Sequence, residues 1–241
     1  MKDTCIELVQ CTYCLKEISA AEATEDHVIA RSWYPANTPP IAKWKVLACK
    51  PCNNRYSTIE QDLLCRAAFC MDPADRSVAR IVQRALRSID PKQARSARDI
   101  KHRFNKRGKM LQGLKQIDNP NAIGVLPSFR DNFFAGSRTG ISVPAKDLKA
   151  IVRKWISGIH FCEFQEYIAS DQEITVHIVE DEVAETAFAE ITQYANRIQK
   201  GPGVEVLIWR AQEDGKAMSL FAFNIWQRFR VYGSVEAEAA G

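Results

Sequence analysis

The alternation of apolar and polar residues along the chain predicts a mixture of helices and strands. Apolar residues recur at helical spacing in residues 78–89, 148–162 and 182–200, whereas residues 173–180 alternate with a period of two, which is typical of a strand. Shorter segments complete the pattern: strands are expected at 24–29, 44–47, 204–210, 218–223 and 225–231, and a helix at 52–66. The predicted fold class is α+β.

Breaks in this pattern divide the chain into parts. Asp72-Pro73 ends the helix that begins near residue 52, because proline cannot continue a helix. Residues 119–140 are rich in Asn, Gly, Pro and Ser, which favours loops and places a boundary near residue 118. The expected parts are 1–70, a helical segment at 71–118, and an α+β domain at 119–241.

Four cysteines have the spacing of a metal site. Cys11, Cys14, Cys49 and Cys52 form two Cys-x-x-Cys pairs with 34 residues between the pairs. Zn²⁺ binds four thiolates in a tetrahedron, and pairs of this spacing supply them from two tight turns. A site with four protein ligands has no open position, so the expected zinc is structural.

Further polar residues stand between and behind the two pairs. Asp26-His27 follows the first pair, and Asn53 comes directly after Cys52. In this order the residues resemble the HNH nuclease motif, the ββα-metal finger, in its cysteine-flanked form. The resemblance covers residues 11–54. It implies an N-terminal ββα-metal (HNH) zinc finger, followed by a basic helical middle and a C-terminal α+β domain of unknown role.

The resemblance also implies an activity. HNH nucleases hydrolyse phosphodiester bonds, and His27 would be the general base, because the pKa of imidazole matches neutral pH. Asp26 and Asn53 would hold a catalytic Mg²⁺ or Mn²⁺ through hard oxygen ligands. The expected substrate is DNA. Small HNH proteins of this kind are similar to nuclease subunits of bacterial anti-phage defence systems, in which an ATPase or sensor partner licenses cutting. Homing and phage-borne nucleases of mobile elements are similar in the same residues, and the sequence does not choose between the two settings.

The chain departs from the family pattern at two positions. Ala30 stands three residues after His27, where the family usually has proline. Trp44 stands where the family usually has an asparagine that orients the catalytic histidine. Asn37 is the remaining asparagine of this loop, and a backbone carbonyl is the other candidate for the orienting role.

Positive charge is concentrated in the middle of the chain. The net charge is only +4, yet residues 72–117 contain thirteen Lys and Arg against four Asp, and residues 160–199 contain nine acidic residues against one Arg. Two basic runs beside a phosphodiester-cleaving finger favour contact with nucleic-acid phosphates. The expected contacts are Arg76, Arg80, Arg84 and Arg87, which share one helix face, and Arg95, Arg98, Lys101, Arg103, Lys106 and Arg107.

Other polar residues are expected to have ordinary roles. Glu60 and Asp62 are predicted to lie on the helix surface, and His102 to contact phosphate. His160 and His177 are predicted to be packed or capping residues rather than ligands.

Composition excludes several classes of protein. No stretch approaches 18 uncharged apolar residues, so no membrane span is expected. The first nine residues are too short and too charged for a signal peptide. Four of the eight cysteines have metal spacing, which favours a reducing, cytoplasmic location over a disulfide scaffold.

Two alternatives remain open at the level of sequence. The first is a zinc-stabilised nucleic-acid-binding protein without catalysis, for which His27→Ala would change nothing. The second is an RNA-directed nuclease with the same finger.

Overall fold

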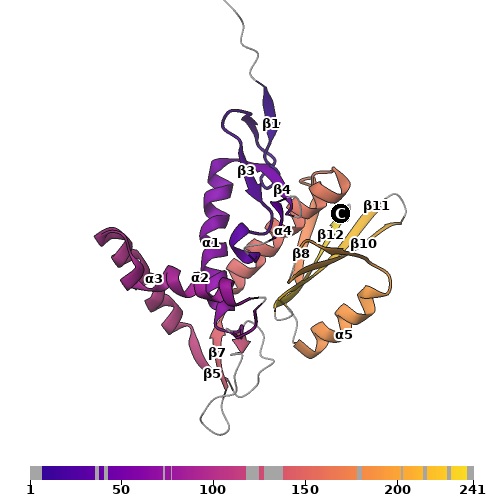
Figure 1. Cartoon of the computed structure of the whole chain (residues 1–241). Helices are drawn as coiled ribbons and strands as arrows, with labels where there is room; N and C mark the ends of the chain where they lie inside the picture. The colour runs from indigo at the N-terminus through magenta and orange to yellow at the C-terminus, as the bar shows by residue number, and fades with distance from the viewer. Residues whose placement is uncertain are drawn as a thin grey trace, which may run out of the picture.

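A computed structural model shows the mixed α+β architecture that the pattern predicts (Figure 1). It describes residues 7–35, 38–40, 43–72, 74–76, 78–117, 125–127, 138–177, 181–201, 203–213, 216–226 and 229–237. Asn37 lies outside these residues, as does most of the stretch 119–140. Within the described part of the chain, no helix has the length and apolar character needed to cross a membrane.

The N-terminal part consists of two hairpins and a long helix. β1 (Leu8–Gln10) pairs with β2 (Glu17–Ser19), and β3 (Thr24–His27) pairs with β4 (Lys45–Ala48), both antiparallel. α1 (Lys50–Ala68) follows β4 directly, with Pro51 in its first turn, where the missing N–H costs no helical hydrogen bond. Strand, strand and helix therefore follow in the order that the sequence predicts.

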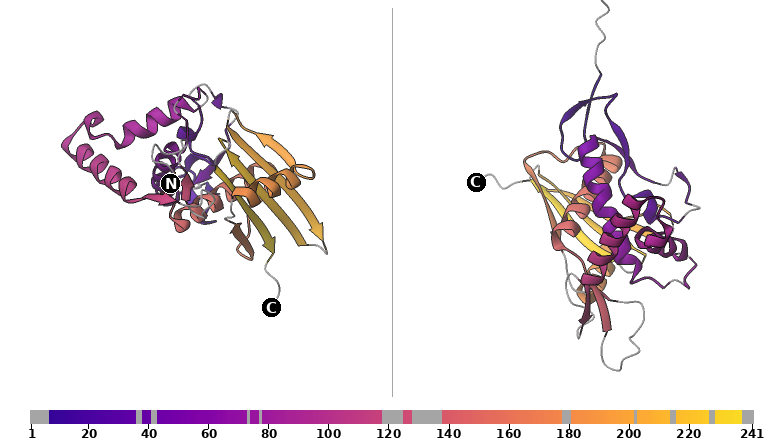
Figure 2. Two further views of the ribbon diagram at one scale, coloured as in Figure 1. Left: turned by 90° about the horizontal axis from the view of Figure 1, so that it is seen from below. Right: turned by 90° about the vertical axis from the view of Figure 1, so that its left-hand side faces the viewer.

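Two helices project from this part. α2 (Ala79–Ile89) packs against α1 and buries most of the apolar face that the sequence predicts. Leu86, which was expected on that face, is exposed. After the short 3-10 helix η3 (Pro91–Gln93), α3 (Ala97–Gln112) begins at Ser96, whose hydroxyl accepts a hydrogen bond from the Asp99 amide. α3 lies at the edge of the molecule, away from the large sheet (Figure 2).

The C-terminal part is built on a five-stranded antiparallel sheet. Its order is β8-β12-β11-β10-β9, and a smaller sheet has the order β5-β7-β6. The strands of the large sheet are β8 (Gln172–His177), β9 (Asn196–Gln199), β10 (Val204–Glu213), β11 (Lys216–Ile225) and β12 (Phe229–Ala237). Those of the small sheet are β5 (Leu114–Ile117), β6 (Val125–Pro127) and β7 (Arg138–Ser142).

Each face of the large sheet is covered by a helix. α4 (Ala145–Phe164) packs on the face that carries Val206 and Phe221, and α5 (Asp181–Thr192) packs on the face that carries Leu207 and Ala222. Successive strand residues point to opposite faces, which explains this division.

The helix expected over residues 182–200 is wrong in its last eight residues, 193–200. α5 ends at Thr192, and Asn196–Gln199 forms β9 at the edge of the large sheet, where Ile198 lies opposite Val206. A helix would also satisfy the backbone groups of these residues, so the gain from pairing with β10 is the packing of Ile198 against the core of the large sheet.

α4 joins the N-terminal part to the large sheet. One continuous cluster of buried residues runs from Val28 to Val235, and Trp155 of α4 lies inside it. The ring of Trp33 stacks on Trp226 at 4.9 Å between centroids and meets Trp155 edge-on at 5.4 Å. Residues on both sides of the boundary expected near residue 118 thus share one hydrophobic core.

Candidate functional site

The four cysteines of the two Cys-x-x-Cys pairs lie together, as their spacing predicts. The Sγ atoms of Cys11, Cys14, Cys49 and Cys52 are all within 4.8 Å of one another, and those of Cys14 and Cys49 are 3.8 Å apart. Zn–S bonds of about 2.3 Å in a tetrahedron place neighbouring sulfurs about 3.8 Å apart. The cluster therefore has the size and the ligands to hold a zinc ion.

This cluster lies where the first hairpin, the second hairpin and α1 meet. The backbone N–H and the hydroxyl of Thr12 both donate to the carbonyl of Leu47 in β4. The amide of Cys49, the N-cap residue of α1, donates to Cys11 Sγ at 3.3 Å. A metal ion in the cluster would fix β4 and the start of α1 to the first Cys-x-x-Cys turn.

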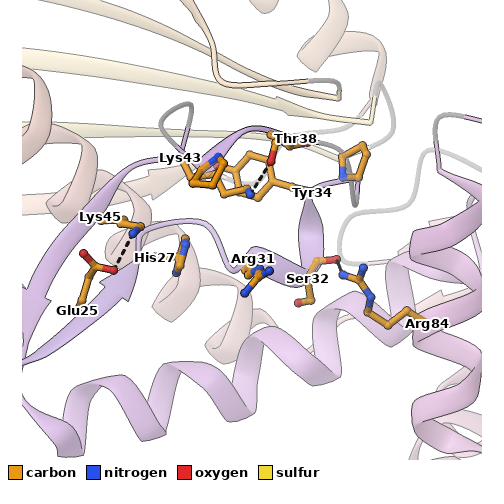
Figure 3. Close-up of a pocket in the computed structure, with 11 residues that line it drawn as sticks. Glu25, His27, Arg31, Ser32, Tyr34, Thr38, Lys43, Lys45 and Arg84 are labelled. Atoms are coloured by element: carbon orange, nitrogen blue, oxygen red, sulfur yellow. Dashed lines mark hydrogen bonds and ion pairs between the residues drawn. The ribbon is translucent and has the colours of Figure 1, made fainter.

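His27 lies at the end of β3 and lines a pocket of about 790 Å³ (Figure 3). Four cationic side chains share this lining: Arg31, Lys43, Lys45 and Arg84. Glu25 also lines the pocket, but its carboxylate is paired with Lys45 at 2.7 Å. The pocket is therefore strongly basic, and a small anion is the ligand that its charge favours.

The surroundings of His27 favour the neutral form of its imidazole. Burial, and after it the charge of Lys45, holds the pKa of His27 below its ordinary value. Its backbone is anchored, because the His27 carbonyl accepts from Lys154 and the next amide, that of Val28, donates to Trp44 O. A neutral imidazole at the wall of a basic pocket can accept a proton from a bound nucleophile.

No described side chain hydrogen-bonds the His27 ring, so its orienting residue is not identified among them. Trp44, which stands in place of the family's asparagine, donates its Nε1–H to Glu163 of α4 at 2.6 Å. Its side chain therefore joins the start of β4 to α4 and does not orient the His27 ring.

Asp26 points to the opposite side of β3 from His27 and is nearly buried. Its Oδ2 accepts from the Tyr13 hydroxyl at 2.8 Å and from Lys154 Nζ at 2.9 Å. Burial, and after it the charge of Asp26, strongly raises the pKa of Tyr13, so its hydroxyl remains a donor. Asp26 is thus bound between the first Cys-x-x-Cys turn and α4.

Glu60 joins the same cluster, which corrects its predicted place on the helix surface. It is 4% exposed, and its Oε1 accepts from Lys154 Nζ at 2.8 Å. Burial raises the pKa of Glu60 to about 7, although Lys154 acts in the opposite direction. One ammonium cannot neutralise two buried carboxylates, which is why one of them holds a proton readily.

Asn53 faces the same side of the hairpin as Asp26. Its Nδ2 donates to Thr24 Oγ1 at 3.0 Å, and the Thr24 hydroxyl donates to Ala48 O at 2.9 Å. Because the Thr24 proton is used for Ala48, Asn53 must turn its NH₂ group toward Thr24. Its amide oxygen is the atom left for another partner.

Asp26 and Asn53 do not fit the divalent ion that the family resemblance assigns to them. A divalent ion on Asp26 would share the carboxylate with the Lys154 ammonium, which lies 2.9 Å from Oδ2, and the two cations would repel each other. The Asp26 carboxylate also already accepts two hydrogen bonds on Oδ2. Lys154, rather than a metal ion, is the cation that this arrangement accommodates.

Eight of the ten basic residues predicted to contact nucleic acid lie on α2 and α3, whereas Arg76 and Arg95 precede these helices, so Arg76 does not share the helix face predicted for it. Arg76, Arg80, Arg84, Arg87, Arg95, Arg98, Lys101 and Arg107 are exposed, whereas Arg103 and Lys106 are partly buried. Arg84 donates to Ser32 O at 3.2 Å and also lines the His27 pocket. It therefore connects the basic face of α2 to His27.

Sequence patterns missed several residues of this site. Arg31 follows His27 by four residues, whereas Lys43 and Lys45 belong to the returning segment, in which Lys45 lies opposite His27 in the β3–β4 pairing. Their positive charge was the available signal. Lys154 interrupts the apolar face of α4, and a lysine between Ile151 and Trp155 was the signal for it. Nothing local shows that its partners are Asp26 and Glu60.

Comparisons of the chain with models of protein families, with curated proteins and with solved structures found no match. The candidate site therefore rests on the chain's own residues: the four-cysteine cluster, the basic pocket at His27, and the buried contacts of Lys154.

Proposed function

We propose that the protein is a nuclease that hydrolyses phosphodiester bonds in DNA, with His27 as its general base. The observation that carries this proposal is the position of His27 in the wall of a pocket lined by four cations, in surroundings that lower the pKa of its imidazole. The resemblance of residues 11–54 to the HNH motif supports the same activity. In that interpretation the four cysteines hold structural zinc, which fixes the hairpin that carries His27.

The pocket contains the groups that phosphodiester hydrolysis requires. The arginines Arg31 and Arg84 offer planar, permanently charged donors to phosphate oxygens, and Lys43 and Lys45 offer ammonium groups. Cations preorganised around the phosphorus stabilise the charge that develops as water attacks. His27 takes the proton from this water, the bond from phosphorus to the leaving sugar oxygen breaks, and the neighbouring cations balance the charge of that oxygen until it takes a proton from solvent.

The basic helices suggest how a long substrate would be held. Arg84 belongs both to the pocket and to the exposed face of α2, so a nucleic-acid backbone bound along α2 would lead to His27. Contacts of this kind position a duplex and carry no sequence preference. We assign this role to the basic residues of α2 and α3.

A specific observation favours RNA as a second candidate substrate. Lys154 engages Asp26, so the divalent ion expected there has no place in the arrangement described. RNA carries its own nucleophile, the 2′-hydroxyl, which a histidine and neighbouring cations can activate without a metal ion. Attack by this hydroxyl would leave a 2′,3′-cyclic phosphate, which identifies the pathway.

The substrate is tested by incubating zinc-loaded protein with supercoiled plasmid and with single-stranded RNA, each with Mg²⁺, with Mn²⁺ and with EDTA. Zinc content is measured in every sample, so that EDTA effects are not confused with loss of the structural ion. Nicking of the plasmid supports the first proposal. Cleavage of RNA alone, with a cyclic phosphate end, supports the second.

Control by another protein is a further part of the proposal, and its support is the resemblance to defence-system nucleases alone. An ATPase or sensor encoded beside this protein would license cutting. Adding the neighbouring proteins to the plasmid assay should then increase cleavage. Binding of DNA with no cleavage under any of these conditions would instead favour a non-catalytic zinc-stabilised nucleic-acid-binding protein.

A further inference from the structure

The ammonium group of Lys154 is surrounded by protein oxygen atoms, whereas that of a surface lysine is surrounded by water. Its side chain is buried, and Nζ contacts three oxygen atoms: Asp26 Oδ2 at 2.9 Å, Glu60 Oε1 at 2.8 Å and His27 O at 2.9 Å. An ammonium has three N–H donors, so each of them has an acceptor. The oxygens surround the charge much as they would surround a metal ion.

Two aromatic rings complete the surroundings of this charge. Nζ lies 5.7 Å from the ring centroid of Tyr13 and 5.8 Å from that of Tyr56, within the range of cation–π attraction. Tyr13 also donates its hydroxyl to the same oxygen of Asp26. The first Cys-x-x-Cys turn, β3 and α1 thus all contribute to one cage around a group from α4.

We propose that the Lys154 ammonium is the resident cation of the Asp26 carboxylate, in the place that the HNH resemblance assigns to a divalent ion. In this role Lys154 is a positioning residue: it holds Asp26 and the end of β3 that carries His27. The inference concerns binding at Asp26, and only its catalytic consequence rests on the proposed function.

The surrounding packing indicates that Lys154 stays in this place. One turn further along α4, Gly158 lies directly against Val28, the residue after His27. Near the end of the same helix, Glu163 accepts the hydrogen bond from Trp44 of the finger. Withdrawal of Lys154 would therefore require separation of α4 from the finger, and both Val28 and Trp155 are part of the continuous core.

The inference is tested by titrating the zinc-loaded protein with Mn²⁺ and no other added metal ion. Electron paramagnetic resonance measures the bound Mn²⁺, and thermal melting measures the stability of each variant. Wild type is compared with Asp26→Asn, Lys154→Met and Lys154→Arg. We expect wild type, Asp26→Asn and Lys154→Arg to bind Mn²⁺ equally weakly. Lys154→Met should bind it at least about tenfold more tightly, because the repelling charge is gone, and adding Asp26→Asn should remove the gain.

Two results would overturn the inference. One is Mn²⁺ binding to wild type that Asp26→Asn abolishes, since the ion and the ammonium would then share the carboxylate. The other is a folded Lys154→Met variant with no gain in affinity. If the Lys154→Met protein does not fold, the double variant Lys154→Met with Glu60→Gln takes its place in the comparison. The second substitution removes one of the two carboxylates that the loss of Lys154 leaves uncompensated.

These readouts are independent of nuclease activity. If no variant cleaves nucleic acid, the proposed function fails while the Mn²⁺ titration still decides the place of Lys154. If wild type cleaves and also binds Mn²⁺ through Asp26, the proposed function stands and the inference fails.

Discussion

At the scale of single residues, β3 presents neighbouring side chains to two different environments. His27 faces a basic pocket, whereas Asp26 faces a buried lysine and a tyrosine hydroxyl. Because successive strand residues point to opposite faces, one adjacent pair can supply both a base and an anchor. The two roles can therefore be separated by mutation.

Arg84 is the residue that tests the connection between α2 and the pocket. Arg84→Ala should weaken DNA binding for all sequences and reduce the slope of log affinity against log salt by about 1, as expected for the loss of one phosphate contact. Binding is measured by fluorescence anisotropy at several salt concentrations. Arg197→Ala, an equal charge change at an exposed position on β9, should leave the slope unchanged. Equal effects of the two variants would indicate that only net charge matters.

The four-cysteine cluster makes a prediction about zinc. Cys49→Ser should lose the bound zinc and much of the stability of the finger, because structural zinc binding contributes on the order of 10 kcal/mol to folding. Zinc content by mass spectrometry and the melting temperature provide the measurement. Cys162→Ser, which lies outside the cluster, should keep one zinc ion per chain. Full zinc content in Cys49→Ser would show that the assignment of the ligands is wrong.

Residue-level chemistry was predictable where partners are close in sequence or follow a known ligand spacing. The Cys-x-x-Cys pairs belong to this class, and so does the placement of His27 on a strand. Glu60 was misplaced because its partner, Lys154, lies 94 residues away. Local periodicity carries no signal for such a contact, which depends on how α4 docks.

At the scale of elements, the contact between α4 and β3 fixes the site. Gly158 allows the closest approach: a Cβ at this position would lie 2.5 Å from Cγ2 and 2.7 Å from Cγ1 of Val28. Val28 is fully buried and β-branched, so it has little freedom to move away. The absence of a side chain at residue 158 thus determines how near Lys154 comes to Asp26.

Gly158→Ala should therefore destabilise the protein by about 1–3 kcal/mol, the usual cost of overpacking a core, despite the better helix propensity of alanine. The matched control is Gly108→Ala in α3, where a Cβ would meet no atom within 4 Å. That substitution should instead stabilise by roughly 0.5–1 kcal/mol. Both are measured by urea unfolding, and a neutral or stabilising Gly158→Ala would contradict the close packing of α4 on β3.

The helices and strands themselves were largely predictable, because period and breakers are local properties. The small sheet was not predicted, and its strand β5 lies at the end of a segment expected to be helical. Residues 196–199 show the reason for such misses. Ile198 and Arg197 continue the amphipathic pattern of the preceding helix, yet pairing with β10 makes them a strand. A tertiary partner outweighed local preference in this segment.

At the scale of the whole molecule, the β3–β4 hairpin and α1 share one core with the large sheet. α4 lies on the C-terminal side of the boundary expected near residue 118, yet it provides the ammonium between Asp26 and Glu60 and the Trp155 ring against Trp33. The position of His27 thus depends on residues more than a hundred positions away. This dependence gives the C-terminal part a structural role at the site, whatever else it does.

A fragment of residues 1–118 should consequently fail to fold cooperatively, even with zinc. It would expose the surface that α4 covers and would leave two carboxylates without their cation, a defect that costs several kcal/mol. Circular dichroism melting of the fragment beside the full chain is the measurement. A sharp transition in the fragment would show that the finger and basic helices form an independent domain.

The central claim, that His27 is the base of a nuclease, is tested most directly by plasmid nicking with His27→Ala beside wild type and His177→Ala. His177 is an exposed histidine on β8 and serves as the matched control. We expect wild type and His177→Ala to nick the plasmid equally, and His27→Ala to lose at least about a hundredfold in rate while keeping its zinc and melting temperature. Equal cleavage by a folded, zinc-loaded His27→Ala protein would contradict the claim.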